Sequence, residues 1–467
     1  MTLAETAYCW TGIAETARWI REGRRSALAL VEARLAVIEE RDRGLNCFTR
    51  IMADRARREA AAIDAAVAAG RDPGPLAGVP FGVKDNYDVA GRVTLAGSII
   101  NRALAPAGAD AVLIQRLTRA GAVLVGTQNM DELAYGFTTE NAHYGATRNP
   151  LDTRRSAGGS SGGSGGAVAA GLCDFALGTD TNGSIRIPAS FCGVFGLKPT
   201  FGRLPRSGTF PFVHDLDHLG LLARDSADLA LVYDVVQGHD AGDPACADRP
   251  REPVSATLDE WFAGRAALLG GWFDDRADAQ GRDAASLIAR ELGATGTIAL
   301  PGAERARAAA FVLTAAAGGN LHFAALRTRA GDFDPATRDR LLAGALLPAN
   351  AVLLAQRYRR AFYEEVMELF QHHDLLIAPA TPCSATLLGQ QTIQVAGRAL
   401  PARPNLGLMT QPLSFAGLPI VAVPVRNGAM PIGVQLIAPP WREDIALRAA
   451  AHLERSGVVR AVEPAPC

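Results

Sequence analysis

Lysine is nearly absent from this chain of 467 residues. Of its 47 basic residues, only Lys84 and Lys198 are lysines, and all the others are arginines. In such a composition, a position that keeps lysine indicates a role that arginine, as a solvated positive charge, does not fill. One such position needs a cation that loses its proton, because a buried lysine shifts its pKa toward neutrality whereas a guanidinium stays charged. Lys84 lies in the apolar, strand-like run 80–85, where the alternative role is a structural ion pair.

Excess charge and paired cysteines are also missing. The net charge of −1 creates no bulk field that would favour nucleic acid or an anionic membrane. The seven cysteines are scattered and have no CxxC spacing, which argues against a disulfide framework or a zinc site and favours the reducing cytoplasm. No basic segment followed by an apolar stretch opens the chain, so we expect no signal peptide.

One uncharged run, residues 308–326, tests the possibility of a membrane span; it is rich in alanine and is interrupted by Gly318, Gly319, Asn320 and His322. A membrane-spanning helix needs about 20 predominantly apolar residues. The interruptions therefore predict a buried helix and its turn, not a membrane span.

The order of apolar patterns predicts an α/β fold. Residues 1–70 read as helices, with Ser26 as a helix cap. From residue 76 to about residue 225, short apolar runs alternate with helical segments, which is typical of a sheet covered by helices. The stretch 226–300 reads as polar and loop-rich with one strand-like run, 266–269, and helices dominate from 305 to 372.

A glycine-serine run at 158–166 is the only low-complexity segment. A flexible linker is one interpretation, but helix-like residues follow at once. A phosphate cradle is another, but no lysine completes a Walker pattern and the GxGxxG spacing fails at Val168. The run also matches G-x-S-x-G around Ser161, which would be a nucleophile elbow if a strand led directly into it. The residues before it, 149–155, read as a loop, which weakens that interpretation.

Ser184 is the second candidate nucleophile. A strand is expected to end near Gly178, and a tight turn then delivers Ser184 to the start of a short helix. Backbone amides at such a turn are free to stabilise an oxyanion. We expect that hole to be formed by the amides of Thr181, Asn182, Gly183 and Ser184. A helix N-cap is the structural alternative for Ser184.

A serine nucleophile needs a base. None of the eight histidines lies in a motif that marks it as that base. Lys84 is the alternative, provided that it is desolvated and neutral.

Three motifs in order resemble the amidase signature family. They are the Gly-Val-Lys-Asp segment with Lys84, the Gly-Gly-Ser-Ser-Gly segment with Ser160, and the Gly-Thr-Asp-Thr-Asn-Gly-Ser segment that ends at Ser184. The 24-residue spacing from Ser160 to Ser184 is that of the family, and similarity extends to 129–132, 196–203 and 430–436.

The resemblance implies a fold and a mechanism. It implies a large mixed sheet covered by helices on both faces, in a single domain over 1–467, with N-terminal helices in 1–75, the signature core in 76–225 and the remainder of the sheet in 226–467. It also implies that Ser184 attacks an amide, that Ser160 relays the proton to neutral Lys84, and that the Gly159–Ser160 peptide bond is cis. Asn182 departs from the glycine common at its position, so its side chain is expected to affect specificity. No metal or cofactor is implied, and Lys198 is expected to be structural.

Within the family, three further stretches (129–141, 181–184 and 211–220) resemble the branch that hydrolyses small biuret-like amides such as 1-carboxybiuret in s-triazine breakdown. A small anionic substrate needs a cation and several hydrogen-bond donors. The candidate substrate-binding residues are Tyr135, Arg154, Arg186, His214 and His218, and Arg186 could instead brace the loop.

The resemblance also implies partners. A homo-oligomer and a small helical companion subunit are expected, whereas nucleic acid and membrane are not. Three other functions compete with a free-standing amidase. They are the glutaminase subunit of a tRNA-dependent amidotransferase, an esterase that uses Ser161 and a histidine, and a catalytically silent binding protein.

Overall fold

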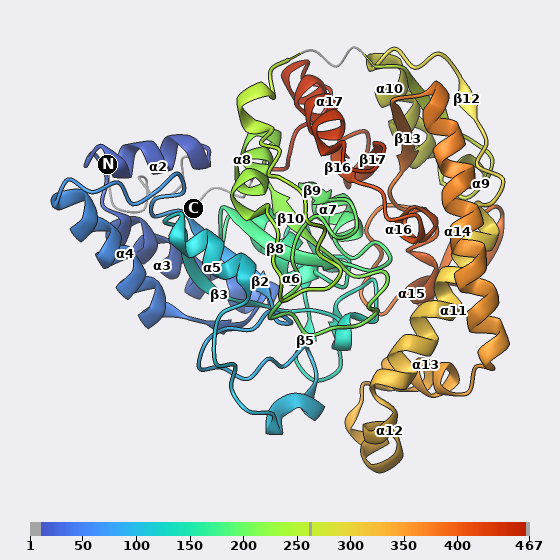
Figure 1. The fold of residues 1–467 in the computed structure, drawn as a ribbon, viewed down its shortest axis with the longest axis horizontal. Helices are drawn as coiled ribbons and strands as arrows, with labels where there is room; N and C mark the ends of the chain where they lie inside the picture. The colour runs from blue at the N-terminus through green and yellow to red at the C-terminus, as the bar shows by residue number, and fades with distance from the viewer. Residues whose placement is uncertain (1–10, 261–263, 464–467) are drawn as a thin grey trace.

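A computed structural model describes residues 11–260 and 264–463 of the chain. Cys9 and Cys467 lie outside these residues, and the five described cysteines, among them Cys47 and Cys383, are all free thiols. An 11-stranded sheet runs through the whole molecule (Figure 1). In spatial order its strands are β1 (Phe48–Ile51), β3 (Val123–Gln128), β2 (Pro80–Lys84), β8 (Phe175–Asp180), β10 (His218–Ala223), β9 (Phe195–Lys198), β16 (Ile420–Val425), β17 (Ile432–Ile437), β13 (Leu375–Pro379), β11 (Ala266–Leu269) and β12 (Thr297–Ile298).

The sheet is mixed, as predicted. β2 pairs in parallel with β3 and β8, and β11 pairs in parallel with β12 and β13, whereas the central strands from β8 to β13 pair antiparallel. Three small ribbons lie outside it: β4 (Glu140–Asn141) with β5 (Gly145–Ala146), β6 (Arg148–Asn149) with β7 (Asp152–Ser156), and β14 (Thr392–Val395) with β15 (Arg398–Pro401). Because strands from both ends of the chain share one sheet, we propose that the chain is a single domain.

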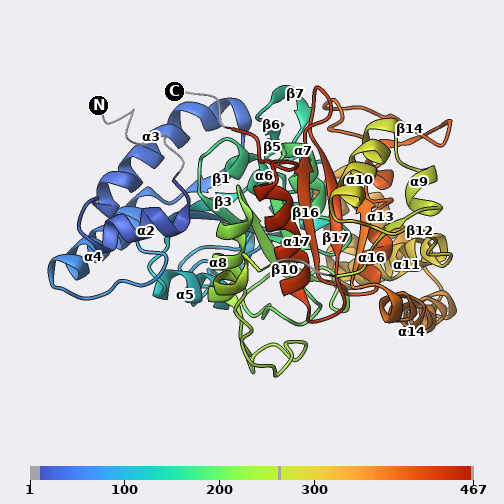
Figure 2. The same ribbon diagram turned by 90° about the horizontal axis from the view of Figure 1, so that it is seen from above.

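Helices cover both faces of the sheet. Successive side chains of a strand point to opposite faces, and every residue of β3, β8, β10, β16 and β17 is buried. Helices α8 and α17 pack on each other and on central strands, and so do α6 and α7 (Figure 2). The helices are α2 (Ile13–Arg21), α3 (Ala27–Leu45), α4 (Ala53–Ala68), α5 (Val112–Arg119), α6 (Gly162–Ala169), α7 (Arg186–Cys192), α8 (Ser226–Val236), α9 (Trp272–Asp275), α10 (Ala279–Glu291), α11 (Ala303–Leu321), α12 (Phe323–Arg329), α13 (Pro335–Ala345), α14 (Ala349–His372), α15 (Ala402–Asn405), α16 (Gln411–Phe415) and α17 (Glu443–Arg455), with 3₁₀ turns at η1 (Ile99–Ala103), η2 (Glu132–Ala134), η3 (Ser255–Thr257) and η4 (Ala330–Asp332).

Several local predictions are confirmed. Ser26 caps α3, accepting a hydrogen bond from the amide of Ala29. The uncharged run 308–326 forms the later part of α11 and the turn into α12, and these two helices are bent by 63°. Among the described residues, no single helix is long and apolar enough to cross a membrane.

Three local predictions are wrong. Residues 1–70 were expected to be helical, but residues 48–51 form the edge strand β1, which pairs with β3. Residues 149–155 were expected as a loop, but β6 and β7 pair there as a short antiparallel ribbon, whose polar residues give no apolar strand pattern in the sequence. Besides the predicted strand β11, the stretch 226–300 contains the short helix α9, the two-residue strand β12 and two longer helices, α8 and α10. α8 and α10 begin at aspartate N-caps, Asp225 and Asp278. Some of the polar residues that suggested loops therefore cap helices.

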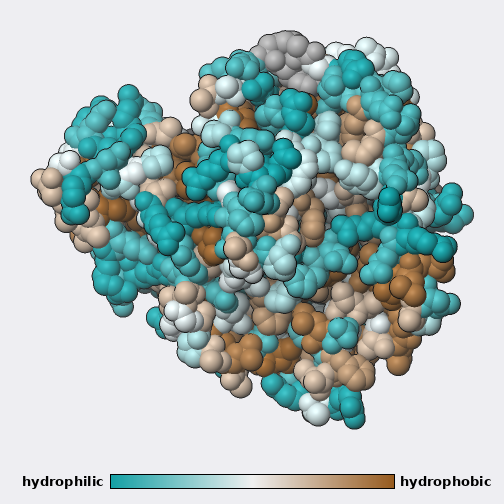
Figure 3. All heavy atoms as spheres, viewed as in Figure 1, coloured by the Kyte–Doolittle hydropathy of each residue, from teal (hydrophilic) through white to brown (hydrophobic). Residues whose placement is uncertain are grey.

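The polarity of the outer surface differs from one region to another. Hydrophilic residues cover the N-terminal helices, whereas apolar residues gather over α11, α13 and α14 (Figures 1 and 3). Exposed apolar side chains there include Leu342, Leu346, Leu353 and Leu354.

Close packing of α11 against α13 generates a stability prediction. A Cβ on Gly344 would lie 1.9 Å from the carbonyl oxygen of Ala315, which belongs to the backbone and cannot swing aside. Gly344→Ala should therefore lower the free energy of unfolding by roughly 1–3 kcal/mol, despite the better helix propensity of alanine. Urea denaturation measures this, with Gly331→Ala as the control because no atom lies within 4 Å of that Cβ. A midpoint for Gly344→Ala equal to or above that of the wild type would contradict the packing.

Candidate active site

Lys84 is the last residue of β2 and is completely buried. Its Nζ lies 2.7 Å from Ser160 Oγ and 2.8 Å from Thr179 Oγ1. Among the residues that the structure describes, no carboxylate forms an ion pair with it. Burial lowers the pKa of Lys84 to about 7, although the more distant charges of Asp131 and Asp180 oppose the shift. The amine is thus neutral in a large fraction of molecules near pH 7.

Ser160 lies in the glycine-rich loop that precedes α6. The Gly159–Ser160 peptide bond is cis, as the resemblance implied. Gly159 has no room for a side chain, since an added Cβ would lie 2.1 Å from Asp131 Oδ2 and 2.5 Å from the amide of Thr138. The loop around Asp131 therefore supports the peptide that carries Ser160.

Ser184 lies in the loop between β8 and α7, with 2% of its surface exposed. The amide of Ser161 donates to the carbonyl oxygen of Ser184 at 3.2 Å, so the loops that carry Ser160 and Ser184 lie side by side. The structural alternative for Ser184, a helix N-cap, is wrong, because α7 is capped at Ile185 and no side chain bonds to its first turn.

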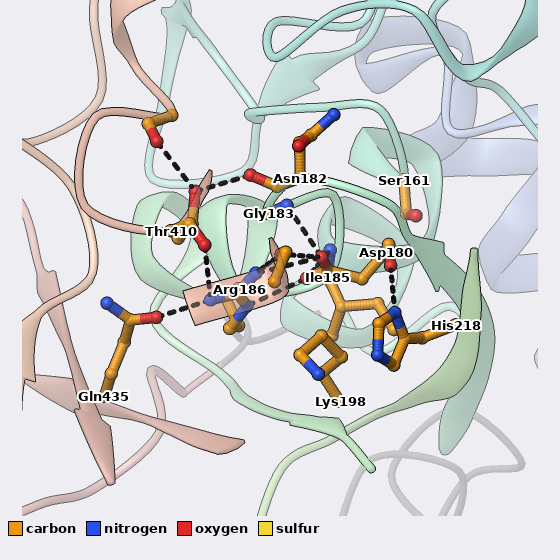
Figure 4. Close-up of polar contacts among 12 residues, drawn as sticks. Ser161, Asp180, Asn182, Gly183, Ile185, Arg186, Lys198, His218, Thr410 and Gln435 are labelled. Carbon is orange, nitrogen blue, oxygen red and sulfur yellow. Dashed lines mark hydrogen bonds and ion pairs between the residues drawn. The ribbon is translucent and has the colours of Figure 1, made fainter. Parts of the chain in front are cut away.

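The loop of Ser184 is held by a buried carboxylate, Asp180 (Figure 4). Its oxygens accept hydrogen bonds from the amides of Gly183 at 2.7 Å and Ile185 at 3.2 Å, and from Nε of Arg186 at 2.9 Å. Burial alone raises the pKa of Asp180, but the Arg186 guanidinium outweighs it and leaves this pKa below its usual value. The carboxylate is therefore ionised and keeps the turn in place.

Arg186 does not bind substrate in this arrangement, which corrects its predicted role. Its guanidinium is fully buried, paired with Asp180, and donates to Gln435 Oε1 at 2.6 Å and to the Thr410 carbonyl oxygen at 3.2 Å (Figure 4). All of these contacts direct the guanidinium to protein acceptors. Arg186 braces the loop, which was the alternative role expected for it.

The predicted oxyanion hole is partly corrected. The amide of Gly183 is occupied by Asp180. Within residues 11–260 and 264–463, the amides of Thr181, Asn182 and Ser184 have no protein acceptor and stay candidates. The Asn182 side chain donates from Nδ2 to Thr314 Oγ1 at 2.9 Å, and its Oδ1 is buried without a partner. Asn182 thus links the Ser184 loop to α11.

His218 is also a correction. It is 3% exposed, and its Nδ1 lies 2.6 Å from the carbonyl oxygen of Leu216 and 3.1 Å from that of Asp180. Burial, followed by the nearby charge of Lys198, lowers the pKa of His218 well below its usual value. A neutral, enclosed imidazole is not the cation that an anionic substrate needs.

The other predicted binding residues have different surroundings. His214 lines a cavity of about 330 Å³ that also reaches Thr179 and Thr181, next to Lys84. Arg154 is exposed, and its guanidinium is paired with the Asp152 carboxylate. Tyr135 is buried, and its hydroxyl has no partner in the described structure.

Ser161 and Lys198 are structural. Ser161 Oγ donates to the carbonyl oxygen of Thr179 and accepts from the amide of the same residue, so it is engaged with the backbone and not with a histidine. This removes the basis for the esterase alternative. The buried Lys198 amine donates to the carbonyl oxygens of Leu418 and Pro199, which fits the structural role expected for it.

Sequence reasoning missed Thr179, Asp180 and Arg340. The first two lie inside the Ser184 motif, where a polar residue at the end of a buried strand was an available signal. Arg340 lies far along the chain in α13, and its Cζ is 3.6 Å from the centre of the Tyr135 ring. Nothing in the sequence pattern separates it from the other arginines.

Comparisons with known proteins agree with this geometry. The family model described as Amidase matches residues 29–447. The chain is 54% identical over 445 residues to AtzE, the 1-carboxybiuret hydrolase subunit of Pseudomonas sp. (strain ADP), covering 94% of this chain and 97% of that protein. It is 36% identical to a glutamyl-tRNA(Gln) amidotransferase subunit of Synechococcus sp. (strain RCC307), covering 95% of this chain and 97% of that protein.

A solved structure of a vestigial protein complex, described as revealing the origins of an s-triazine catabolic enzyme, superposes with a TM-score of 0.95 at 53% identity. It covers 97% of this chain and all of that one. The chain therefore belongs to the amidase family.

Proposed function

We propose that this amidase hydrolyses a small urea- or biuret-like amide, with 1-carboxybiuret as the substrate, and releases ammonia. The substrate assignment follows the relative that is 54% identical. The amidotransferase relatives are more distant at 36% identity, so glutaminase activity within such an assembly is not favoured. The observation that carries the chemistry is the buried, unpaired Lys84 amine 2.7 Å from Ser160 Oγ.

The proposed reaction has two halves. Ser184 Oγ attacks the amide carbon while its proton moves to Ser160, whose own proton moves to neutral Lys84 Nζ. The relay then returns a proton to the amide nitrogen, the C–N bond breaks and ammonia leaves, with the acyl group bound to Ser184 as an ester. Water attacks this carbamate ester with help from the same relay, which releases the carbamic acid and restores Ser184.

The negative charge that develops on the carbonyl oxygen during the attack needs hydrogen-bond donors to stabilise it. Amides with no protein acceptor serve this purpose without rearrangement. We propose those of Thr181, Asn182 and Ser184 for this role. The buried carboxylate of Asp180 and its partner Arg186 keep this turn rigid, so they act as positioning residues.

Partners and location are also proposals. The relative in the solved structure belongs to a protein complex. By analogy, we propose that this chain forms a homo-oligomer and works beside a small helical companion subunit. The free, scattered cysteines support a cytoplasmic location.

Ammonia release tests the proposed activity. The assay compares 1-carboxybiuret with biuret, glutamine and simple aliphatic and aromatic amides. Ser184→Ala should lower turnover by at least about 10⁴-fold, because it removes the nucleophile, and Ser160→Ala by about 10²-fold or more, because it removes the proton relay.

The matched control is Ser164→Ala, a buried serine in the same segment whose hydroxyl donates only to the carbonyl oxygen of Leu177. It should keep activity close to that of the wild type. Activity that survives Ser184→Ala would contradict the mechanism. Serine-dependent turnover of another amide, with none of 1-carboxybiuret, would contradict the substrate alone.

The pKa of Lys84 generates a pH prediction. Lys84 acts in its neutral form, and its pKa is about 7. The value of kcat/KM should therefore rise about tenfold per pH unit below this pKa and level off above it. Lys84→Arg should be inactive at every pH tested, since a guanidinium keeps its proton. A wild-type profile that is flat from acid to neutral pH, or one that rises only near pH 10, would contradict the role of Lys84.

A further inference from the structure

Asp217, the residue just before β10, is hydrogen-bonded to two loops beside the candidate active site. It lines the cavity of about 330 Å³ that also reaches Thr179 and Thr181. One carboxylate oxygen, Oδ1, accepts a hydrogen bond from Thr181 Oγ1 at 2.6 Å. The other, Oδ2, accepts from the amides of Phe212 at 2.8 Å and Val213 at 2.9 Å. All three contacts donate to Asp217, which is the arrangement that suits an ionised carboxylate.

The contact with Thr181 fixes one side of the Ser184 turn. Thr181 is the first residue after β8, and Ser184 follows three residues later. Within the described part of the chain, the backbone amide of Thr181 has no protein acceptor, and it is one of the donors proposed for the oxyanion. Because the Thr181 side chain is tied to Asp217, turning this amide away from the substrate carbonyl would break a charge-assisted hydrogen bond.

The contacts with Phe212 and Val213 fix the wall of the cavity. Residues 206–212 line this cavity together with Asp217. The Phe212 ring packs against that of Tyr135, with 4.9 Å between the ring centres. One carboxylate is thus the common anchor of the cavity wall and of the turn that carries Ser184.

The charge of Asp217 also acts on Lys84. Thr179 lies 2.8 Å from Lys84 Nζ and lines the same cavity as Asp217. Three carboxylates influence Lys84 through space, those of Asp131, Asp180 and Asp217, and each favours its protonated form. Their combined charge therefore opposes the burial that makes the amine neutral.

Asp217 differs from Asp180 in how its charge is balanced. Asp180 forms an ion pair with Arg186, whereas Asp217 forms none among residues 11–260 and 264–463. Burial raises the pKa of Asp217, and the hydrogen bonds to its oxygens and the more distant charge of Arg206 oppose this shift. Arg206 itself is paired with Asp243 at 3.0 Å. The charge of Asp217 is thus offset by hydrogen bonds and not by a paired cation.

We propose that Asp217 is a positioning residue of the amidase reaction, whose hydrogen bond directs the Thr181 amide toward the oxyanion and whose charge acts on Lys84 across the shared cavity. This inference rests on the proposed function, in which Lys84 is the base and the Thr181 amide is an oxyanion donor. In this role Asp217 acts through these two groups and does not react with the substrate.

Asp217→Asn tests the charge, since asparagine has nearly the same size and keeps one oxygen for the amides of Phe212 and Val213. Without the negative charge, the protonated form of Lys84 is less favoured, so kcat/KM should reach its plateau at a lower pH than in the wild type. NMR titration of side-chain-labelled lysine should show the same displacement of the Lys84 midpoint, and it does not require turnover. Asp215→Asn is the matched control, because this exposed acid lies two residues away; it should move neither midpoint.

Thr181→Val tests the hydrogen bond, because valine has the shape of threonine and cannot donate. It should lower kcat by about tenfold or more, since the oxyanion donor is no longer held in place, and leave KM and the pH midpoint nearly unchanged. Thr181→Ser keeps the hydroxyl and should recover most of the activity. Thermal melting checks that each variant is folded, and the Thr181 pair tests the proposal even if Asp217→Asn does not fold.

The outcomes separate this inference from the proposed function. A Lys84 midpoint in Asp217→Asn equal to that of the wild type would overturn the role of the charge, whichever amide is the substrate. Wild-type kcat in Thr181→Val would overturn the role of the hydrogen bond. Activity that survives Ser184→Ala would contradict the proposed function, and the NMR titration would still decide whether Asp217 acts on Lys84.

Discussion

The chemistry of this molecule depends on one desolvated amine. Lys84 ends a strand that lies inside the sheet between β3 and β8, and helices cover both faces there. No carboxylate pairs with it among the described residues, so burial dominates and its pKa falls to about 7. Two hydroxyls, those of Ser160 and Thr179, satisfy its hydrogen bonds without adding charge. An ion pair in their place would have kept the amine protonated and unable to accept a proton.

Asp180 is a second buried ionisable group, but unlike Lys84 it stays charged. Asp180 is kept ionised by Arg186, and together they fix the turn that carries Ser184. A buried charge is tolerated only when it is paired and hydrogen-bonded, and here the bonding groups are the amides of the turn itself. The same contact that neutralises Asp180 therefore orders the nucleophile loop.

The sequence predicts much of this arrangement, for identifiable reasons. Buried strands such as β3 and β8 are continuous apolar runs, and α3 and α4 follow clear helical periodicity. Lysine scarcity and the turn before a short helix singled out Lys84 and Ser184. Ser160 was assigned only through the resemblance to the amidase signature family, and the structure places Lys84 against Ser160. The orientation of polar side chains was not predictable in the same way. Arg186 and His218 lie close to Ser184 along the chain or across the sheet but point into the protein, and Arg340 reaches the site only through the packing of α13 on α11.

The scarcity of lysine makes the central claim directly measurable. With lysine labelled at its side chain, the protein should give two side-chain NMR signals, and Lys84→Met assigns them. We expect the Lys84 signal to titrate with a midpoint near pH 7, as its pKa of about 7 requires, and Lys198 to titrate below the usual lysine range. A Lys84 signal that stays in the protonated form until about pH 10, as for a solvated lysine, would contradict the account.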